Sequence, residues 1–114
     1  MKIDKIRNVL NAKILCGEDK LQDEVKSACA SDLMSDVLAF VKDEAVLITG
    51  LCNPQIVRTA EMMDMRCIVI VRSKKPDAEI IDLARQKGIV MLSCEYRMFE
   101  AAGKLYEAGL NREV

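Results

Sequence analysis

The amino-acid sequence predicts a single α/β domain, with a mainly parallel sheet of five strands flanked by helices. Short runs rich in β-branched residues alternate with longer stretches in which apolar residues recur every three or four positions. Glycine, proline and asparagine stand where one pattern changes into the other. Strands that alternate with helices of about 10–15 residues are joined by right-handed crossovers, so they lie parallel in one sheet.

The predicted strands are five short apolar runs. They cover residues 12–16, 25–30, 45–49, 67–71 and 89–93. The segment between the first two runs, residues 17–24, has no helical spacing. That part of the sheet is therefore predicted to be irregular or antiparallel.

The predicted helices are five stretches with helical spacing. They cover residues 3–10, 32–42, 54–65, 77–87 and 95–108. Each has an apolar face that is expected to pack on the sheet. In chain order, these faces carry Ile3, Ile6, Val9 and Leu10; Leu33, Val37, Leu38 and Val41; Ile56, Val57, Ala60 and Met63; Ile80, Ile81 and Ala84; and Met98, Phe99, Ala102, Leu105 and Tyr106.

Capping residues mark the ends of these helices. Ser31 or Asp32 can cap the second predicted helix with a side-chain oxygen, and Asn53 can cap the third. Asp77 stands at the start of the fourth. Glycines follow the last two helices, where a left-handed residue commonly ends a helix, at Gly88 and Gly109.

The composition is that of one globular domain of 114 residues, with 51% hydrophobic and 31% charged residues. The formal net charge is −1, so we do not expect a nucleic-acid binder, which needs a basic surplus. No apolar run approaches the roughly 20 residues of a membrane-spanning helix. Residues 1–7 lack the apolar segment of a signal peptide. We therefore expect a cytoplasmic protein that does not contact a membrane.

The cysteine and histidine content limits the possible chemistry. The chain has no histidine, the commonest acid–base residue and metal ligand near neutral pH. Cys16, Cys52 and Cys94 follow predicted strand ends on what should be one edge, and could hold a soft metal if they converged. However, the chain has no Cys-x-x-Cys pair, and Cys29 and Cys67 fall inside strands as small core residues. The sequence predicts neither a metal nor a cofactor.

Four segments carry a resemblance to a known family: residues 21–38, with Ser-Asp-Leu-x-Ser-Asp-Val at 31–37, and residues 67–71, 76–77 and 99–106. That family is the DRTGG domain family. The resemblance covers about residues 13–110, and implies one DRTGG-like domain over residues 1–114 with an N-terminal helix in residues 1–12. It also implies a compact α/β fold similar to the N-terminal domain of HPr kinase/phosphorylase.

The resemblance further implies a role in dimerisation or ligand sensing. DRTGG domains often sit beside nucleotide-sensing CBS domains or enzymes of acetyl-phosphate metabolism. This chain departs from the family at the motif that names it, because Ser27 and Ala28 replace paired glycines and no arginine stands beside Asp23. A ligand that needs a close backbone approach at those glycines would be lost or changed here.

Ligands of open parallel sheets usually bind where the strands end. The candidate ligand-binding residues stand at or just beyond the predicted strand ends: Gly17, Ser31, Asp32, Thr49, Gly50, Asn53, Arg72, Lys74 and Ser93. Free N–H groups at helix starts, together with the charge of Arg72 and its lysine neighbours, suit a phosphate or an adenine nucleotide. The glycine-rich loops of the named nucleotide-binding motifs are absent. The alternative is that Ser31 and Asn53 only cap helices and that the lysines are only solvated.

Asp32 and Asp36 lie four residues apart on the second predicted helix and share a face. Paired carboxylates could perform acid–base chemistry or bind a divalent cation. The alternative is that Asp32 interacts with the helix dipole and Asp36 with solvent or a partner.

The favoured function is a non-catalytic regulatory module that forms a homodimer and binds a small anionic ligand. No nucleophile stands beside a base in any motif, so no catalytic residue is predicted. One alternative is a small enzyme or enzyme subunit that acts on a phosphorylated metabolite through Arg72, Lys74 and Asp32. Another is an interaction subunit that docks on a larger metabolic or redox complex through methionines, since Met62, Met63 and Met65 cannot all face one core.

Overall fold

The computed structural model describes residues 1–40 and 44–111, with Phe40 described by its backbone alone. Its sheet has the strand order β1-β5-β4-β3-β2. The strands are β1 (Lys13–Cys16), β2 (Ser27–Ala30), β3 (Ala45–Thr49), β4 (Cys67–Ile70) and β5 (Val90–Ser93). β2 to β5 pair in parallel, whereas β1 lies at one end of the sheet and pairs antiparallel with β5. The predicted mainly parallel α/β sheet is confirmed. The sequence predicts that the part around the first two strands is irregular or antiparallel, and the structure shows β1 antiparallel and β2 parallel to its neighbour.

The helices are α1 (Ile3–Leu10), α2 (Met34–Phe40), α3 (Pro54–Met62), α4 (Ala78–Gln86) and α5 (Met98–Glu107). A short 3₁₀ turn, Glu18–Lys20, stands between β1 and β2. No helix in residues 1–40 and 44–111 is both long and apolar enough to cross a membrane.

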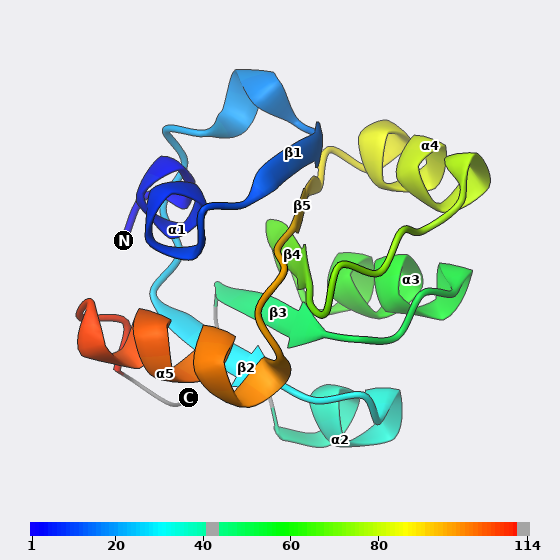
Figure 1. Ribbon diagram of the computed structural model, residues 1–114. Helices are drawn as coiled ribbons and strands as arrows, with labels where there is room; N and C mark the ends of the chain where they lie inside the picture. Colours follow the sequence, from blue (N-terminus) through cyan, green and yellow to red (C-terminus); the bar gives the residue numbers. More distant parts are fainter. Residues whose placement is uncertain (41–43, 112–114) are drawn as a thin grey trace.

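The helices form two layers, one on each face of the sheet (Figure 1). α2, α3 and α4 share one face because the chain steps from β2 to β5 in one direction, and right-handed crossovers then fall on the same side. α1 and α5 cover the other face, where they contact each other. Every residue of β3 and β4 is buried, as expected for central parallel strands covered on both faces.

Each face of the sheet has its own apolar core. Buried side chains of α2, α3 and α4 pack on one face: Met34, Val37, Ile56, Val57, Ala60, Ile80 and Ala84. Buried side chains of α1 and α5 pack on the other: Ile3, Ile6, Leu10, Ala101 and Leu105. Met65 is buried in the first core, Met63 is partly buried and the Met62 side chain is 70% exposed, so the three methionines do not share one core.

Two predicted helix faces are partly wrong. Phe99 and Tyr106 are 89% and 63% exposed, and it is Ala101 and Leu105 that α5 turns inward. Ala101 and Leu105 are four residues apart and share the buried face of the helix, and Phe99 and Tyr106 fall outside that face. On the opposite side, Leu33 and Leu38 are exposed, while Met34 and Val37 are buried. Val41 lies outside the described residues.

The helix ends agree only in part with the predicted caps. The Asp77 carboxylate accepts a hydrogen bond from the Ile80 N–H at 3.2 Å, and so caps α4. Gly88 and Gly109 have the expected left-handed φ, 70° and 114°. Of the two predicted caps of α2, Asp32 is wrong, because its side chain crosses to β3 instead of bonding to its own helix. The Ser31 hydroxyl oxygen accepts from the Leu33 N–H directly before α2.

Candidate functional site

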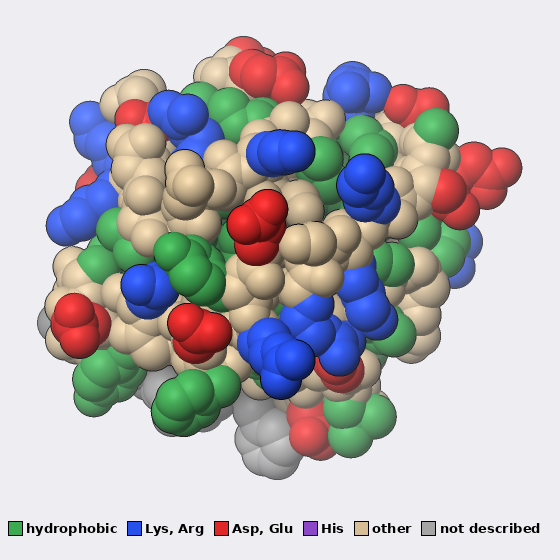
Figure 2. All heavy atoms as spheres, in the orientation of Figure 1, with side chains coloured by type: hydrophobic (Ala, Val, Ile, Leu, Met, Phe, Trp, Pro, Cys, Tyr) green, Lys and Arg blue, Asp and Glu red, His purple; other side chains and the backbone are tan. Residues whose placement is uncertain are grey.

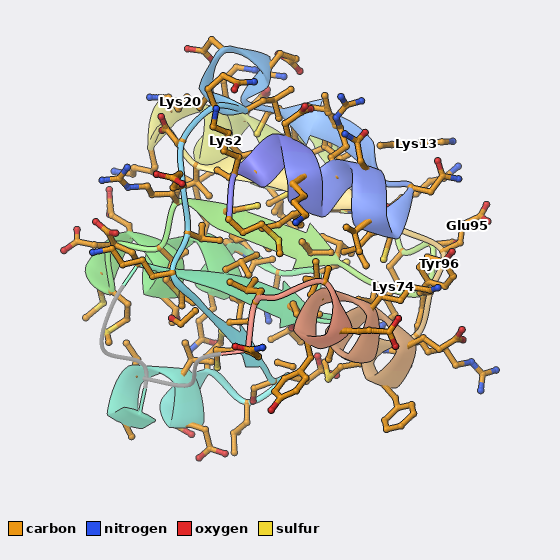
Figure 3. All side chains as sticks on the ribbon, turned by 90° about the vertical axis from the view of Figure 1, so that its left-hand side faces the viewer. Lys2, Lys13, Lys20, Lys74, Glu95 and Tyr96 are labelled. Atoms are coloured by element: carbon orange, nitrogen blue, oxygen red, sulfur yellow. The ribbon has the colours of Figure 1, made fainter. Side chains whose placement is uncertain are left out.

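The carboxyl edge of the sheet brings five chain segments together. β2, β3, β4 and β5 end there because they are parallel, and β1 begins there because it runs the other way. Figure 3 shows Lys13, Lys74, Glu95 and Tyr96 on the side to which the strand arrows point, and Lys20 on the opposite side. Side chains from segments far apart in the sequence therefore meet at this edge.

Asp32 is tied to the end of β3. Its Oδ1 accepts hydrogen bonds from the Gly50 N–H at 2.7 Å and from the Thr49 hydroxyl at 2.9 Å. Burial raises the pKa of Asp32, but these two hydrogen bonds and the nearby charges of Arg72 and Lys74 outweigh it. The resulting pKa lies below the usual value for Asp. The carboxylate is thus held as an anion among hydrogen-bond donors and positive charges.

The guanidinium of Arg72 lies against the backbone of Gly50. A Cβ atom placed on Gly50 would be 2.5 Å from Nη2 of Arg72 and 3.2 Å from its Nε. Glycine therefore leaves the room that the guanidinium occupies at this point. Figure 2 shows Lys and Arg side chains gathered over the region where β3 ends and the chain leaves β4, with acidic side chains among them.

The loop from β4 to α4 is anchored on the neighbouring connection. Arg72 and Ser73 both have left-handed φ angles, 63° and 55°, which residues other than glycine seldom adopt. The Arg72 N–H donates to the Tyr96 carbonyl at 2.8 Å, and the Ser73 N–H donates to the Cys94 carbonyl at 2.9 Å. The segments after β4 and β5 thus hold each other in place through backbone hydrogen bonds. These bonds position the start of the basic loop.

A groove of about 690 Å³ lies beside this loop, between the ends of β4 and β5 and the start of β1. Lys13, Lys74 and Lys75 line it together with Glu95, so its charge is mainly positive. Its apolar wall is formed by Leu15, Pro76 and Ile81. The volume falls within the roughly 300–1,000 Å³ typical of small-molecule pockets. Such a groove suits an anionic ligand that also has an apolar part.

Three other predicted site residues lie at this edge. The Ser93 hydroxyl donates to the Lys74 carbonyl at 3.4 Å and lines the groove. The Ser31 hydroxyl oxygen accepts from the Leu33 N–H at 3.0 Å, within the loop before α2. Asn53 precedes α3 but its side chain makes no capping hydrogen bond, and within the described residues its buried Oδ1 has no partner.

Gly17 lies at the opposite edge, so the prediction that it stands with the other candidates is wrong. β1 runs antiparallel to β5, so its carboxyl end meets the start of that strand. Gly17 packs there so closely that a Cβ atom on it would be 2.8 Å from Cα of Val90. Cys16 lies at the same edge and donates from Sγ to the Ile89 carbonyl at 3.3 Å. It therefore cannot join Cys52 and Cys94 in one metal site.

Burial raises the pKa of four thiols, those of Cys16, Cys52, Cys67 and Cys94. The thiolate is the form that attacks a substrate or ligates a metal. Burial therefore disfavours both kinds of chemistry at these positions.

Lys13 is the positively charged groove residue that the sequence reasoning missed. The prediction considered only residues that follow strands, whereas Lys13 begins one. The signal in the sequence was the missing helix between the first two strands, which already indicated a change of direction there. An antiparallel first strand brings its own start, and with it Lys13 and Asn11, to the edge where the parallel strands end.

Comparison with known proteins identifies a family and a similar solved structure. The DRTGG domain model matches residues 5–108. The chain is similar in structure to the CBS and DRTGG domains of the regulatory region of Clostridium perfringens pyrophosphatase, with a TM-score of 0.73 and 17% sequence identity. That region was crystallised in complex with its activator, diadenosine tetraphosphate. The match covers 91% of this chain and 45% of that one, and at this identity it shows the fold alone. A search of curated proteins found no match.

Proposed function

The chain belongs to the DRTGG domain family, as its sequence predicted, and on that premise we propose that it is a non-catalytic regulatory module that binds a phosphate-bearing small molecule such as a nucleotide. The observation that carries the proposal is the groove at the carboxyl edge. Its three lysines come from the start of β1 and from the loop after β4.

The chemistry of the groove supports a ligand with two different parts. Lys13, Lys74 and Lys75 can donate charge-assisted hydrogen bonds to phosphoryl oxygens. Leu15 and Ile81 offer an apolar wall to a base or another flat group. The similar regulatory region of the pyrophosphatase binds a dinucleotide, which supports a nucleotide-type ligand for this chain as well.

The state of the candidate reactive groups supports binding without catalysis. A general base works best when its pKa lies near the working pH, whereas the pKa of Asp32 is lowered. Its oxygen also already accepts two hydrogen bonds. The Cys52 thiol, which lies near the same charges, has its pKa raised by burial. None of these groups is prepared to act as a base or a nucleophile.

We also propose that the module forms a homodimer through α5. Phe99 and Tyr106 are seven residues apart, so they lie on one face of the helix with Gly103 between them. Both side chains are mostly exposed, and burying a large apolar side chain stabilises an interface by about 1.5–3 kcal/mol. A two-fold axis across this face would pair the helix with its own copy. Exposed Glu100 and Lys104 carry the opposite charges that such a pairing can use.

The groove is tested by calorimetric titration of the protein with ATP. We expect saturable binding, weakened roughly tenfold for each lysine removed by Lys13→Gln and Lys74→Gln, because each loses a charge-assisted contact of about 1.5 kcal/mol. Lys20→Gln is the matched control, since Lys20 lies at the other edge of the sheet. Absence of heat at millimolar ATP, or equal weakening by the control, would refute the proposal.

A further inference from the structure

We propose that the end of β3 is a separate anion subsite that takes a phosphoryl group, and that the Asp32 carboxylate competes with that group for the subsite. The inference rests on the proposed function only in taking the ligand to bear phosphate. It adds a second contact point outside the groove and an internal competitor for that point.

The donors at the end of β3 converge on a single oxygen atom. The Gly50 N–H and the Thr49 hydroxyl both donate to Oδ1 of Asp32, at 2.7 Å and 2.9 Å. The Leu51 N–H donates to the hydroxyl oxygen of Thr49 at 3.1 Å. The Thr49 hydroxyl thus accepts one hydrogen bond from Leu51 and donates its proton to Asp32. A backbone N–H and a hydroxyl aimed at one oxyanion position are the contacts that hold phosphoryl oxygens in proteins.

Two positively charged side chains lie near the same position. The Arg72 guanidinium occupies the space that a side chain at Gly50 would fill, and its Nη2 lies 2.5 Å from where that Cβ would be. Arg72 and Lys74 both lower the pKa of Asp32, so their charges act at the carboxylate. Arginine binds phosphate through a planar set of donors, as it binds carboxylate.

Asp32 can leave this position. Its side chain is exposed, and it sits on the loop between β2 and α2 rather than within either element. Lys74 lines the groove and its charge also lowers the pKa of Asp32, so the groove and the subsite share one positive charge. A phosphoryl group entering from the groove side would replace the carboxylate at Gly50 and Thr49. The loop before α2 would then lose the side-chain tie from Asp32 to β3 and keep the bond from the Ser31 N–H to the Ile48 carbonyl, so ligand binding would loosen the start of α2.

The test compares the binding of inorganic phosphate to wild type and variants by calorimetry. We expect Asp32→Ala to bind phosphate about tenfold tighter than wild type, because a repelling carboxylate is removed and two donors become available. Asp36→Ala, an exposed carboxylate four residues further along, is the matched control and should show no gain. Adding Arg72→Gln to Asp32→Ala should remove the gain. A folded Asp32→Ala protein that binds phosphate no better than wild type would overturn the inference.

Asp32→Asn serves if the alanine variant does not fold, and it should show a smaller gain. Titration of the wild type with phosphate, followed by NMR of the backbone amides, gives a third readout. The Gly50 amide should shift on saturation, and an unchanged Gly50 amide would count against the subsite. The proposed groove fails separately: it is refuted if ATP does not bind the wild type, even if Asp32→Ala gains phosphate binding.

Discussion

At the scale of single residues, Asp32 shows how tertiary contacts change the role of a side chain. The sequence predicts it as a helix cap, as half of a carboxylate pair, or as a ligand-binding residue at the strand ends. The first two interpretations place its partners on its own helix, and the third places it at the same edge as Thr49 and Gly50 without a bond between them. In the structure its Oδ1 accepts instead from Thr49 and Gly50, which are 17 and 18 residues away. No local pattern indicates this contact, because it depends on β2 and β3 being neighbours in register.

We expect Asp32→Asn to be less stable than wild type at neutral pH, and the difference to disappear in acid. The pKa of Asp32 is lower in the folded protein than the value near 4 of an unfolded chain. Its charge therefore stabilises the fold above that value, and the stabilisation is lost as the pH falls through the lowered pKa. Thermal unfolding followed by circular dichroism between pH 7 and about pH 2.5 measures this. A difference in Tm that stays constant over this range would contradict the expectation, and Asp36→Asn is the control.

At the scale of elements, two helix starts that look alike in sequence differ in structure. Asn53 and Asp77 both stand at N-cap positions with extended backbone. Asp77 accepts a hydrogen bond from Ile80, whereas Asn53 makes no capping bond, and its buried Oδ1 has no hydrogen-bond partner among the described residues. α3 begins with Pro54 at its first helical position. The proline ring already fixes a helical φ there, so this helix start depends less on a side-chain cap.

We expect Asp77→Ala to lower the free energy of unfolding by about 1 kcal/mol, the usual effect of losing an N-cap. Asn53→Ala should cost less than about 0.5 kcal/mol, because it removes no capping bond and also removes an unpaired buried oxygen. Urea denaturation of the two variants measures the difference, provided that their m-values agree with the wild type. Equal losses in the two variants would mean that the Asn53 side chain does cap α3 in solution.

At the scale of the whole molecule, one reversed strand and one exposed helix face determine what the surface offers. Because β1 is antiparallel, Lys13 reaches the groove and Gly17 is removed from it. Because α5 packs through Ala101 and Leu105, its aromatic residues are left outside the core. The first arrangement is the basis of the proposed ligand groove, and the second is the basis of the proposed dimer face.

We expect the protein to be a dimer by size-exclusion chromatography with light scattering, and Phe99→Ser combined with Tyr106→Ser to be monomeric. The double substitution removes the two aromatic side chains that paired α5 helices would bury. Neither of these side chains belongs to the core. Met62→Ser is the matched control, because Met62 is 70% exposed on α3, on the other face of the sheet. A wild-type protein that stays monomeric at high concentration would refute the dimer, and a monomeric Met62→Ser would place the interface elsewhere.

The sequence by itself determined the elements and their order. β3 and α1 have the predicted bounds, and the other described elements begin and end within a few residues of theirs, because period, propensity and punctuation are local properties. It also determined which polar and basic residues stand at the ends of the parallel strands, because the alternation of strands and helices gives the position of each strand end. Tertiary structure decided which of them meet. Strand direction, helix rotation and the register of neighbouring strands depend on packing between distant segments, and these brought Lys13 to the groove, Asp32 to β3 and Phe99 to the surface.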